Sequence, residues 1–431
     1  MSAVVPSAAI TPAARLRGRL ELPADKSIGH RALIVNALSG GPATVTMRAP
    51  GLDLRSTVAC LRALGVTVTE ETSGARTRFT ISGLPHLDAT LDCGNSGTTM
   101  RLLAGAVAAL PLRVTFDGDA SLRSRPMERV ASLLRAAGAD AVTTDGHAPM
   151  VVTDRHELVA MTHRLPVASA QLVGAAALAA LGAAGETRIE TPAPTRDHTE
   201  RILAAAGVDI RRDGLATTVR GPAKPQPLTM TVPGDISSAA PWLVAGAIHP
   251  EADITLHGVG LNPSRTALVA LLRRMGADVE MSVSDDSGPE PIGELRVRGG
   301  RRLSAVVIGG AEVAPLIDEL PLVAIAMAAA DGRSELRDAG ELRVKESDRI
   351  SATVEGLRGI GANVDELPDG WRVSRGEPAN ARIATHGDHR IAIAFAIAAA
   401  AGVAASVELD DADCVSVSYP GFWDDLATVA A

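Results

Sequence analysis

Aromatic residues and lysine are both scarce in this chain of 431 residues. Phenylalanine, tyrosine and tryptophan make up 2% of the sequence, three of the 42 basic residues are lysine, and the formal net charge is −8. Nucleic-acid-binding proteins normally combine a basic surface with aromatic side chains that stack on bases. We therefore do not expect nucleic acid as a partner.

Cysteines and long apolar runs are also few. Cys60, Cys93 and Cys414 lie far apart with no C-x-x-C spacing, which predicts neither a disulfide framework nor a zinc site and fits a reducing cytoplasm. The most apolar stretches, from Gln171 and from Ile391, span about 15 residues, short of the roughly 20 that cross a bilayer. The N-terminus lacks the features of a secretory signal. We expect a cytoplasmic protein without a membrane partner.

Helix ends marked by glycine recur along the chain, at intervals of about 70 residues. The motifs "LRALG", "LRAAG", "LAAAG", "LRRMG" and "LRGIG" end at Gly65, Gly138, Gly207, Gly276 and Gly361. Glycine is the usual left-handed residue after a helix, and the segments that follow have the pattern of short strands. Each unit therefore contains a helix, a tight stop and a strand.

Each unit also has a more apolar helix whose opening is small, polar or charged. The six openings are marked by Ser27, Ser96, Ser169, Ser237, Glu319 and His389. Repetition at this period predicts copies of one α/β module, with the Ala- and Gly-rich helices at the centre because they are apolar on nearly every face. Since 431 residues exceed the usual size of one core, we expect two domains of three modules, with a hinge at Pro233 and Gly234.

Cations gather at the predicted helix openings, where unpaired N–H groups and the helix dipole attract anions. Asn95 is expected to cap one inner helix, and Gly97 would let a ligand approach the backbone closely. The charged and polar candidates near inner or outer helix openings are Lys26, Ser27, Arg31, Arg125, Arg196, Lys345, Glu346, Arg349 and Arg390. Two of the three lysines in such places indicate that a compact, titratable ammonium is needed there.

Simpler interpretations exist for these residues. A single arginine near a helix start is usually solvated or paired with an acid, and Ser169 and Gln171 could be plain caps. His386, Asp388 and His389 have loose metal-ligand spacing, but no third strong ligand lies nearby in the sequence, so no metal is expected. No nucleotide motif occurs in its required context, and no cofactor is expected. The residues alone predict a two-domain α/β enzyme for small, multiply anionic substrates, with Asp318 and Glu346 beside ammonium groups for proton transfer.

The chain resembles the 5-enolpyruvylshikimate-3-phosphate synthase family along nearly its whole length. The shared segments, in family order, are "ADKSIGHR", "GNSGTTMR", "GDASLRSRPM", "SAQ", "TRDHTE", "PGDISS", "IDELP", "ELRVKESDR" and "GDHRIA". Several of them look most like the divergent bacterial class that includes glyphosate-tolerant members. The resemblance implies a two-domain inside-out α/β barrel of six repeated units. Its domains would be 23–235 and 1–22 with 236–431, and the active site would lie in the interdomain cleft.

The same resemblance implies transfer of the enolpyruvyl group of phosphoenolpyruvate to the 5-hydroxyl of shikimate 3-phosphate, a step of aromatic amino acid biosynthesis. The positions that match the shikimate 3-phosphate site are Ser27, Arg31, Ser169, Ala170, Gln171 and Arg196. Those that match the phosphoenolpyruvate site are Lys26, Asn95, Gly97, Arg125, Arg349 and Arg390. Asp318 would deprotonate the hydroxyl, Glu346 and Lys26 would carry protons, and Lys345 would hold shikimate oxygens.

Two positions depart from better-known members of the family, which carry a tyrosine near Arg196 and a lysine in the stretch that is "VSVSYPGFW" here. The second difference leaves one phosphate or carboxylate contact unassigned. The related transferase that acts on UDP-N-acetylglucosamine is an alternative, but it would have asparagine at Ser27 and usually a reactive cysteine in a Gly-rich loop. A non-enzymatic phosphate-binding scaffold would need neither Asp318 nor Glu346. We expect a monomer.

Overall fold

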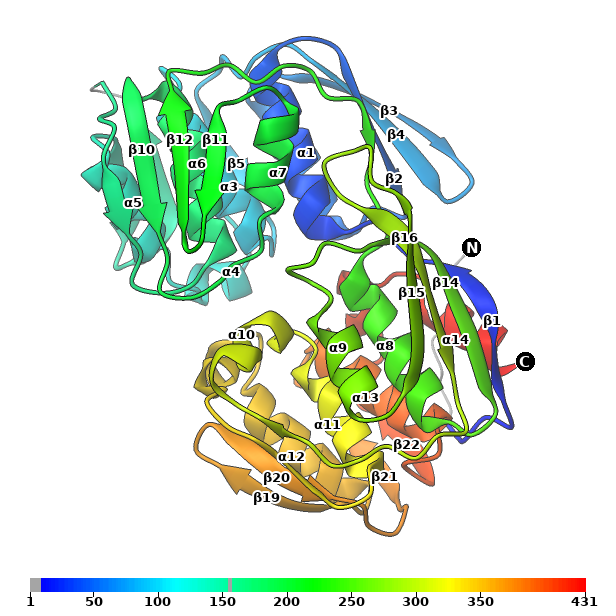
Figure 1. Ribbon diagram of the computed structural model, residues 1–431. Helices are drawn as coiled ribbons and strands as arrows, with labels where there is room; N and C mark the ends of the chain where they lie inside the picture. The colour runs from blue at the N-terminus through cyan, green and yellow to red at the C-terminus, as the bar shows by residue number, and fades with distance from the viewer. Residues whose placement is uncertain (1–8, 154–156) are drawn as a thin grey trace. The chain divides into compact units, whose positions relative to one another are not determined.

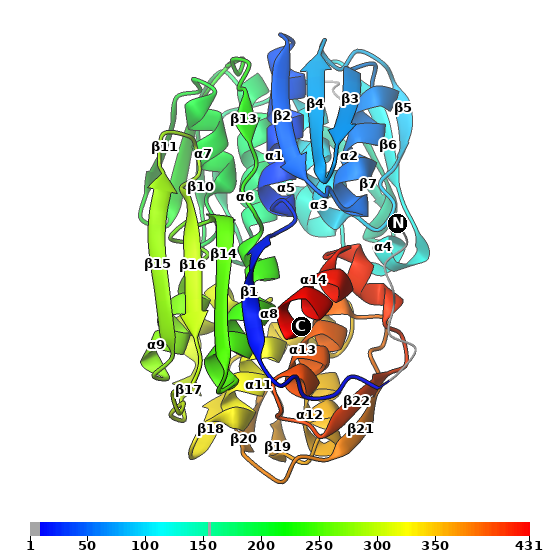
Figure 2. The ribbon, with the colours of Figure 1, turned by 90° about the vertical axis from the view of Figure 1, so that its right-hand side faces the viewer.

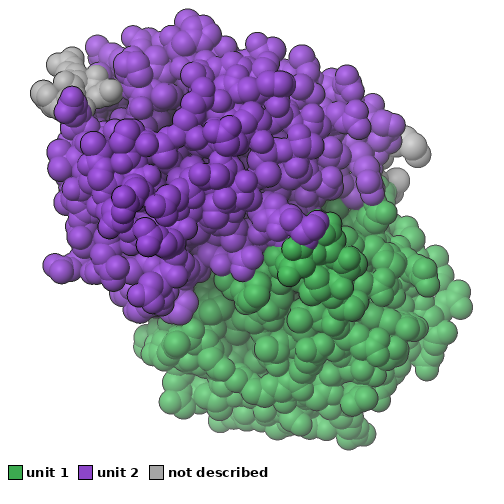
Figure 3. Space-filling view, turned by 45° about the horizontal axis from the view of Figure 1, so that its top comes forward, with its two compact units in different colours: residues 1–23, 234–286, 291–431 green, residues 24–233, 287–290 purple. Residues whose placement is uncertain are grey.

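The computed structural model describes residues 9–153 and 157–431. The chain forms two compact units, which Figure 3 shows in separate colours. Unit 1 consists of Met1–Pro23, Gly234–Asp286 and Pro291–Ala431, and unit 2 of Ala24–Pro233 and Ser287–Glu290. The short segment 287–290 therefore belongs with unit 2, although the sequence on both sides of it belongs to unit 1.

Unit 2 contains three four-stranded sheets of one topology, each with a parallel pair at one edge followed by two antiparallel partners. The first sheet has the order β13 (Met230–Thr231), β2 (Ala43–Arg48), β4 (Arg76–Ser82), β3 (Thr67–Ser73). The second has the order β5 (Ala89–Asp92), β6 (Arg113–Asp117), β8 (His147–Thr153), β7 (Asp140–Thr144). The third has the order β9 (Thr162–Arg164), β10 (Gly185–Glu190), β12 (Ala216–Gly221), β11 (Ile210–Asp213).

Unit 1 repeats this topology twice and then shortens it. One sheet has the order β1 (Leu16–Glu21), β14 (Ala252–Gly260), β16 (Ile292–Arg298), β15 (Asp278–Asp285). The next has the order β17 (Val307–Ile308), β18 (Arg333–Leu336), β20 (Gly370–Ser374), β19 (Asn363–Leu367). The last is the parallel pair β21 (Asn380–Ile383) and β22 (Ser406–Leu409). The predicted fold class of six related α/β modules, three in each half, is confirmed.

The edge strands β1 and β13 are exchanged between two modules, so that each completes the sheet of the other module (Figure 2). By its place in the repeat, β1 precedes the first inner helix and would border β2. Instead β1 pairs in parallel with β14, from Leu16 opposite Ala252 to Glu21 opposite His257. The strand β13 takes the vacant place and pairs with β2. The N-terminal strand thus completes a sheet of unit 1, and a strand from residue 230 onward completes a sheet of unit 2.

The helices alternate between an inner and an outer set. The inner helices are α1 (Lys26–Ser39), α3 (Gly97–Ala108) and α6 (Ala170–Ala179) in unit 2, and α8 (Ile236–Ile248), α11 (Leu320–Ala329) and α13 (His389–Ala400) in unit 1. The outer helices are α2 (Leu52–Ala63), α5 (Glu128–Ala136) and α7 (His198–Ala205), then α9 (Ala267–Arg274), α12 (Arg349–Gly359) and α14 (Phe422–Ala430). The short helices are α4 (Ala120–Ser124), α10 (Val313–Leu316), η1 (Ala180–Gly182), η2 (Gly310–Glu312), η3 (Gly340–Val344) and η4 (Asp413–Val417).

Inner helices pack closely because their contact residues are small. In unit 2, α3 packs against α6, and α6 also contacts β10 (Figure 1). A Cβ added at Gly105 of α3 would lie 2.3 Å from the carbonyl oxygen of Ala175 in α6, closer than any side chain could fit. In unit 1, every residue of α11 from Leu320 to Ala328 is buried. The prediction that these helices form the centre of each unit is confirmed. No helix among the described residues is long and apolar enough to cross a membrane.

The five glycine stops predicted from the repeat all have a left-handed backbone. Their φ values are 88° at Gly65, 100° at Gly138, 81° at Gly207, 101° at Gly276 and 91° at Gly361. At Gly361 an added Cβ would also lie 2.0 Å from the carbonyl oxygen of Glu377. A side chain at this position would therefore be both strained and blocked.

The scarce aromatic residues concentrate in unit 1. Trp242 of α8 packs against Tyr419 and Phe422, and Phe422 also contacts Trp423. The Tyr419 hydroxyl accepts a hydrogen bond from Trp242 Nε1 at 3.0 Å and donates one to Asp425 at 2.6 Å. The C-terminal segment is thus anchored in the core of unit 1.

A buried polar chain links three helices of unit 2. His30 Nδ1 in α1 lies 2.7 Å from Thr57 Oγ1 in α2, which lies 2.7 Å from Thr99 Oγ1 in α3. Thr99 in turn is hydrogen-bonded to Ser96, both through its hydroxyl and through its backbone N–H. Burial lowers the pKa of His30 from 6.5 to about 3, so the imidazole is neutral in the folded protein.

We expect His30 to make folding sensitive to acid. The unfolded chain takes up a proton near pH 6.5 and the folded chain only near pH 3, so the unfolding free energy should fall as pH falls below 6.5. His30→Asn should cost about 1–2 kcal/mol at pH 8 through lost packing, and this deficit should narrow as pH is lowered to about 4.5. Urea titrations of both proteins across this range provide the test, and a constant deficit would contradict it.

Candidate functional site

The first helix of unit 2 begins with a lysine held by an aspartate. Asp25 caps α1 by accepting a hydrogen bond from the backbone N–H of Ile28 at 3.0 Å. Lys26 is the first residue of the helix, and its Nζ lies 3.3 Å from Asp53 Oδ2. The Lys26 side chain is 37% exposed, so it can still reach a ligand. Sequence analysis did not identify Asp53, which lies at the start of α2.

Arg31 joins the starts of three helices. Its Nε donates to Thr199 Oγ1 at 2.7 Å, its Nη1 to the Ser27 carbonyl at 2.9 Å and its Nη2 to the Ala170 carbonyl at 3.2 Å. Burial lowers the pKa of Arg31 to about 10, so the guanidinium stays charged at neutral pH. Ser169 caps α6 by accepting from the Leu172 N–H at 3.4 Å. The structure therefore brings Ser27, Arg31, Ser169 and Ala170 together.

Arg196 adds positive charge near Arg31. It directly precedes Asp197, the N-cap of α7, and it is half-buried. Its positive charge is one of those that lower the pKa of Arg31, after the larger effect of burial. The starts of α1, α6 and α7 thus share a region of positive charge.

A second arginine of unit 2, which is half-buried, was not assigned a role from the sequence. Arg101 of α3 donates from Nη1 to Gln171 Oε1 at 2.6 Å, and Gln171 Nε2 donates to Thr98 Oγ1 at 2.9 Å. Burial, with the nearby charge of Arg125, lowers the pKa of Arg101 to about 10. Arg101 lies in the segment "CGNSGTTMR" that sequence analysis singled out, but its partner Gln171 is distant in the sequence.

The start of α3 differs from the sequence prediction. Asn95 is not the cap: Ser96 is, because its Oγ accepts from the Thr99 N–H at 3.1 Å. Asn95 instead donates from Nδ2 to Asp119 at 2.9 Å and accepts from Arg125 Nη2 at 2.6 Å. A Cβ added at Gly97 would lie 2.9 Å from Arg101 Nη1 and 3.6 Å from Arg125 Nη1. Gly97 thus leaves room beside two guanidinium groups.

Arg125 and Lys345 are placed differently from the prediction. Arg125 ends the short helix α4, and the outer helix α5 begins only at Glu128. Lys345 ends η3, and Asp348 caps α12 by accepting from the N–H groups of Ile350 and Ser351 at 3.1 Å. Lys345 and Glu346 therefore lie in the connection before α12, where sequence analysis had included them in the helix opening. Lys345 is half-buried and, within the described part of the chain, has no ion-pair partner.

Arg349 gathers the carboxylates of unit 1. Its side chain is 2% exposed, and it donates from Nη2 to Glu346 Oε2 at 2.6 Å and from Nε to Asp388 Oδ2 at 2.8 Å. Its Nη1 lies 3.8 Å from Asp318 Oδ1. Burial alone would lower the pKa of Arg349, but the carboxylates of Glu346 and Asp388 outweigh burial and raise it. The structure therefore brings Asp318, Glu346 and Arg349 together, as proton transfer would require.

Asp388, which sequence analysis considered only as a metal ligand, holds this cluster in place. It caps α13 through the Arg390 N–H at 2.9 Å, and it accepts from Arg349 and from Ser347 Oγ. Its side chain is fully buried. Burial by itself would raise the pKa of Asp388, but the Arg349 guanidinium lowers it overall. Asp388 therefore stays ionised and fixes the direction of Arg349.

Arg390 is supported by a separate buried chain. Its Nη1 lies 3.9 Å from Glu319 Oε1, and Glu319 accepts a short hydrogen bond from Ser237 Oγ. Ser237 accepts from Arg265 Nη2 at 2.7 Å, and Arg265 lies 3.6 Å from Asp235, the cap of α8. Sequence analysis used Glu319 and Ser237 only as repeat landmarks. Here they connect the starts of α8, α11 and α13.

The site residues described above form two groups, the unit 2 cluster and the unit 1 cluster. The unit 2 cluster is Lys26, Ser27, Arg31, Asn95, Gly97, Arg101, Arg125, Ser169, Ala170, Gln171 and Arg196. The unit 1 cluster is Asp318, Glu319, Lys345, Glu346, Arg349, Asp388 and Arg390. The unit 2 cluster is cationic and suits anions, whereas the unit 1 cluster mixes cations with carboxylates and suits proton transfer.

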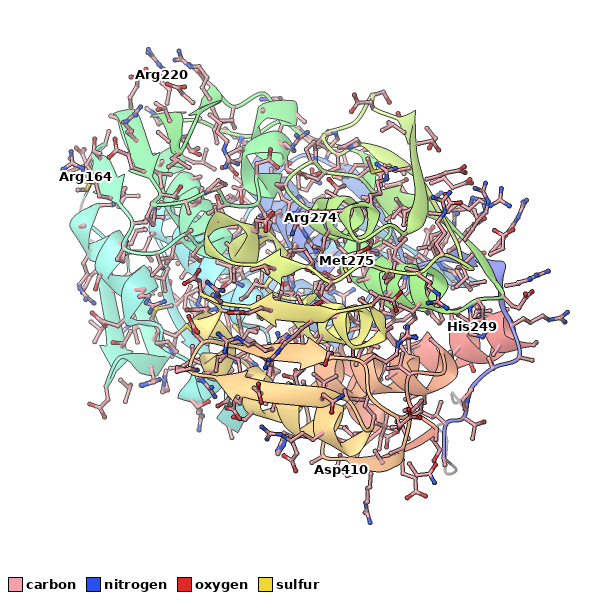
Figure 4. All side chains as sticks on the ribbon, turned by 60° about the horizontal axis from the view of Figure 1, so that its bottom comes forward. Arg164, Arg220, His249, Arg274, Met275 and Asp410 are labelled. Atoms are coloured by element: carbon pink, nitrogen blue, oxygen red, sulfur yellow. The ribbon has the colours of Figure 1, made fainter. Side chains whose placement is uncertain are left out.

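Many arginines outside the two clusters form ion pairs at the surface. Arg164 and Arg220, labelled in Figure 4, have side chains that are 83% and 60% exposed. A cavity of about 360 Å³ in unit 2 is lined by Asp92, Asp117, Asp119 and Arg123 among others. These carboxylates hold backbone N–H groups and Arg123, and an acidic lining does not suit an anionic ligand.

Comparisons with known proteins agree with one another. A model of the family described as EPSP synthase (3-phosphoshikimate 1-carboxyvinyltransferase) matches residues 10–426. A 3-phosphoshikimate 1-carboxyvinyltransferase from Gloeobacter violaceus is 45% identical over 426 residues, covering 97% of this chain and 98% of the relative. One from Herpetosiphon aurantiacus is 43% identical over 429 residues, covering 97% and 98%.

Solved structures give the same result. EPSP synthase from Acinetobacter baumannii superposes with a TM-score of 0.87 at 36% identity and covers 98% of each chain. The enolpyruvyl transferase NikO from Streptomyces tendae has a TM-score of 0.76 at 19% identity, covering 98% of this chain and 97% of its own. The second likeness supports the fold alone.

Asp388→Asn should destabilise the protein by about 3 kcal/mol, because it leaves Arg349 buried with one strong ion-pair partner fewer. Since the pKa of Asp388 is lowered in the folded state, its contribution should be present at neutral pH and be lost as pH falls through that lowered value. Urea denaturation at neutral pH measures the effect. Asp365→Asn is the control, because Asp365 is 63% exposed in its pair with Arg333 and should matter little. Equal losses in the two variants would contradict the role of Asp388.

Proposed function

The chain belongs to the EPSP synthase (3-phosphoshikimate 1-carboxyvinyltransferase) family, and we propose that its two clusters bind and activate the two substrates of that reaction. The enzyme transfers the enolpyruvyl group of phosphoenolpyruvate to the 5-hydroxyl of shikimate 3-phosphate and releases phosphate, a step of the shikimate pathway. The residue assignment rests on one observation: Asp318 and Glu346 both lie within ion-pair distance of Arg349.

Shikimate 3-phosphate is assigned to the starts of α1, α6 and α7. The residues proposed to bind it are Ser27, Arg31, Ser169, Ala170, Gln171 and Arg196. Two of Arg31's donors hold the carbonyls of Ser27 and Ala170, so Arg31 supplies positive charge while it also sets the geometry of the neighbouring backbone. Arg196 and the capping hydroxyl of Ser169 provide donors suited to a phosphate.

Phosphoenolpyruvate is assigned to a second set of cations and backbone groups. The residues proposed to bind it are Lys26, Asn95, Gly97, Arg125, Arg349 and Arg390, the second and third through their backbone. Arg125 and Arg349 offer planar guanidinium groups that match carboxylate and phosphate oxygens. Carboxylates hold Arg349 in place, so its orientation is set before a ligand arrives.

The reaction needs one base and one acid. Asp318, whose Oδ1 lies 3.8 Å from Arg349 Nη1, takes the proton of the 5-hydroxyl while the hydroxyl oxygen bonds to C2 of phosphoenolpyruvate. Glu346 and Lys26 are assigned to deliver a proton to the methylene carbon, which yields a tetrahedral intermediate. Loss of a methyl proton and cleavage of the C2–O bond to phosphate then restore the double bond. Lys345 is assigned to shikimate oxygens.

The C-terminal segment leaves one anion contact unassigned. Residues 411–431 contain no lysine or arginine, and Tyr419 and Phe422 are buried in the core of unit 1. The contact that a lysine makes in better-known members must therefore come from another part of the chain. We keep the predictions of a monomer and of a cytoplasmic location as part of this proposal.

The alternative substrate, UDP-N-acetylglucosamine, is not favoured. Ser27 replaces the expected asparagine, and Cys93 is fully buried instead of lying in an open loop. A hydrogen bond with Cys60 and burial raise the pKa of the Cys93 thiol, so it stays protonated and unreactive. A phosphate-release assay that requires both phosphoenolpyruvate and shikimate 3-phosphate tests the proposed reaction against this substrate and against a non-enzymatic scaffold.

Glu346→Gln should slow turnover by a factor on the order of 10² or more, with little change in substrate binding, because the amide keeps the size but cannot relay a proton. Steady-state kinetics give the answer. Glu341→Gln is a matched control, because Glu341 is exposed and lies five residues earlier in the same stretch. If the Glu346 variant turns over within a few-fold of wild type, the proton-transfer assignment is wrong.

Glyphosate should inhibit this enzyme, because Gly97 leaves space beside Arg101 and Arg125 that an added methyl would narrow. Gly97→Ala should weaken the inhibitor far more than phosphoenolpyruvate, since the clash acts on the longer ligand. The inhibition constants against phosphoenolpyruvate in the two proteins, with the KM for phosphoenolpyruvate, measure this effect. Equal inhibition constants would rule out the steric explanation.

A further inference from the structure

The loop between β15 and β16 ends in a buried carboxylate. The hairpin is exposed from Met281 through Gly288 and Pro289 is half-buried, yet Glu290 is 2% exposed. Residues 287–290 belong to unit 2, whereas β15 and β16 belong to unit 1. The chain thus enters unit 2 for four residues and leaves it again, and Glu290 is the last of them.

The backbone around Glu290 is restricted on both sides. Glu290 lies between Pro289 and Pro291, so the φ angles of both neighbours are fixed, and each residue that precedes a proline is biased toward an extended conformation. The carbonyl of Pro291 also accepts a hydrogen bond from the Leu261 N–H at 2.8 Å. The segment Pro289–Glu290–Pro291 therefore presents its carboxylate with little conformational freedom.

Glu290 binds the first residue of α7. Its Oε1 lies 2.7 Å from His198 Nδ1, and both side chains are 1% exposed. We assign the shared proton to Nδ1, so that the Nδ1–H donates and the carboxylate oxygen accepts. A hydrogen bond that is shielded from water is strong and directional. The position of the α7 start therefore depends on a residue 92 positions away.

Residues close to His198 in the sequence belong to the unit 2 cluster or contact it. Arg196 lies two positions before it, and Thr199, the next residue, accepts from Arg31 Nε at 2.7 Å. The Glu290 carboxylate is also one of the acidic groups that act to raise the pKa of Arg31 against the effect of burial. A shift of the first turn of α7 would therefore move Arg196 and would also alter the hydrogen bond between Arg31 and Thr199.

We propose that Glu290 is a positioning residue for shikimate 3-phosphate, which it serves through His198 by fixing the first turn of α7. This inference rests on the proposed function, because it takes Arg196 and Arg31 as residues of that substrate's site. The residues assigned to phosphoenolpyruvate lie at the starts of α1, α3, α12 and α13 and at the end of α4. Loss of the Glu290–His198 contact should therefore act on one substrate and spare the other.

The primary experiment compares Glu290→Leu with Glu294→Leu, because leucine removes the acceptor whereas glutamine would keep one. Glu294 is a matched control, because it lies in the adjoining strand β16 and pairs with His257 Nδ1 at the same 2.7 Å, but both of these side chains are more than a third exposed. Glu290→Leu should raise the KM for shikimate 3-phosphate about tenfold, while the KM for phosphoenolpyruvate and kcat stay within about threefold. Glu294→Leu should match wild type. An unchanged KM for shikimate 3-phosphate, or an equal rise in both KM values, would overturn the proposal.

Substitutions of His198 test the same contact from the other side. His198→Asn keeps a donor near the position of Nδ1 and should largely retain the affinity for shikimate 3-phosphate, whereas His198→Leu removes the donor and should resemble Glu290→Leu. Equal KM values for the two His198 variants would overturn the hydrogen-bonding role. A Glu290 variant that does not fold would show a requirement of folding and would also overturn it.

Hydrogen exchange separates this proposal from the proposed function. In the ligand-free protein, amides of residues 198–205 should exchange faster in Glu290→Leu than in wild type, and those of α5 should not change. This comparison needs no substrate, so it tests the anchoring of α7 even if the wild type fails to release phosphate. Absence of activity in the wild type would count against the proposed function, and unchanged exchange in α7 would count against the anchor.

Discussion

Close packing between helices built from small residues is the constraint on which the rest of each unit depends. Gly105 can approach the Ala175 carbonyl only because it has no side chain, and Gly356 of α12 is in similar contact with the ring of Phe395 in α13. Helices that touch closely bring their starts near one another. In unit 2 this lets one side chain, Arg31, reach the starts of α6 and α7 while it belongs to α1. A cluster of anion-binding groups follows from packing before any ligand is considered.

The two clusters solve the problem of burying an arginine in different ways. Arg31 is satisfied by a hydroxyl and two carbonyl oxygens, which accept hydrogen bonds but carry no full charge. Arg349 is satisfied by the carboxylates of Glu346 and Asp388, which neutralise it. The first arrangement preserves positive charge, which suits an anionic ligand, and the second places carboxylates beside a guanidinium, which suits proton transfer. The electrostatic character of each cluster therefore follows from how its buried arginine is satisfied.

Local features of the fold were predicted well from the sequence. The glycine stops were found because a left-handed residue after a helix leaves few choices, and the inner helices were found because they are apolar on every face. The errors were also local. Asn95 and Ser96 are both good caps, and Ser96 has that role because Asn95 is engaged by Arg125 and Asp119. Lys345 lies outside α12 because Asp348 supplies the cap of that helix.

The sequence by itself determined the repeat, the inner and outer helices and the types of residue at each helix start, because these depend on neighbours within a few positions. Only the tertiary structure decided which of those residues meet. Arg31 and Thr199 are 168 positions apart, Arg349 and Asp388 are 39 apart, and His198 and Glu290 are 92 apart. The pairings of β1 with β14 and of β13 with β2 are of the same kind, since each joins segments that lie far apart in the sequence. Such pairings depend on how the modules pack, and no short segment of sequence carries that information.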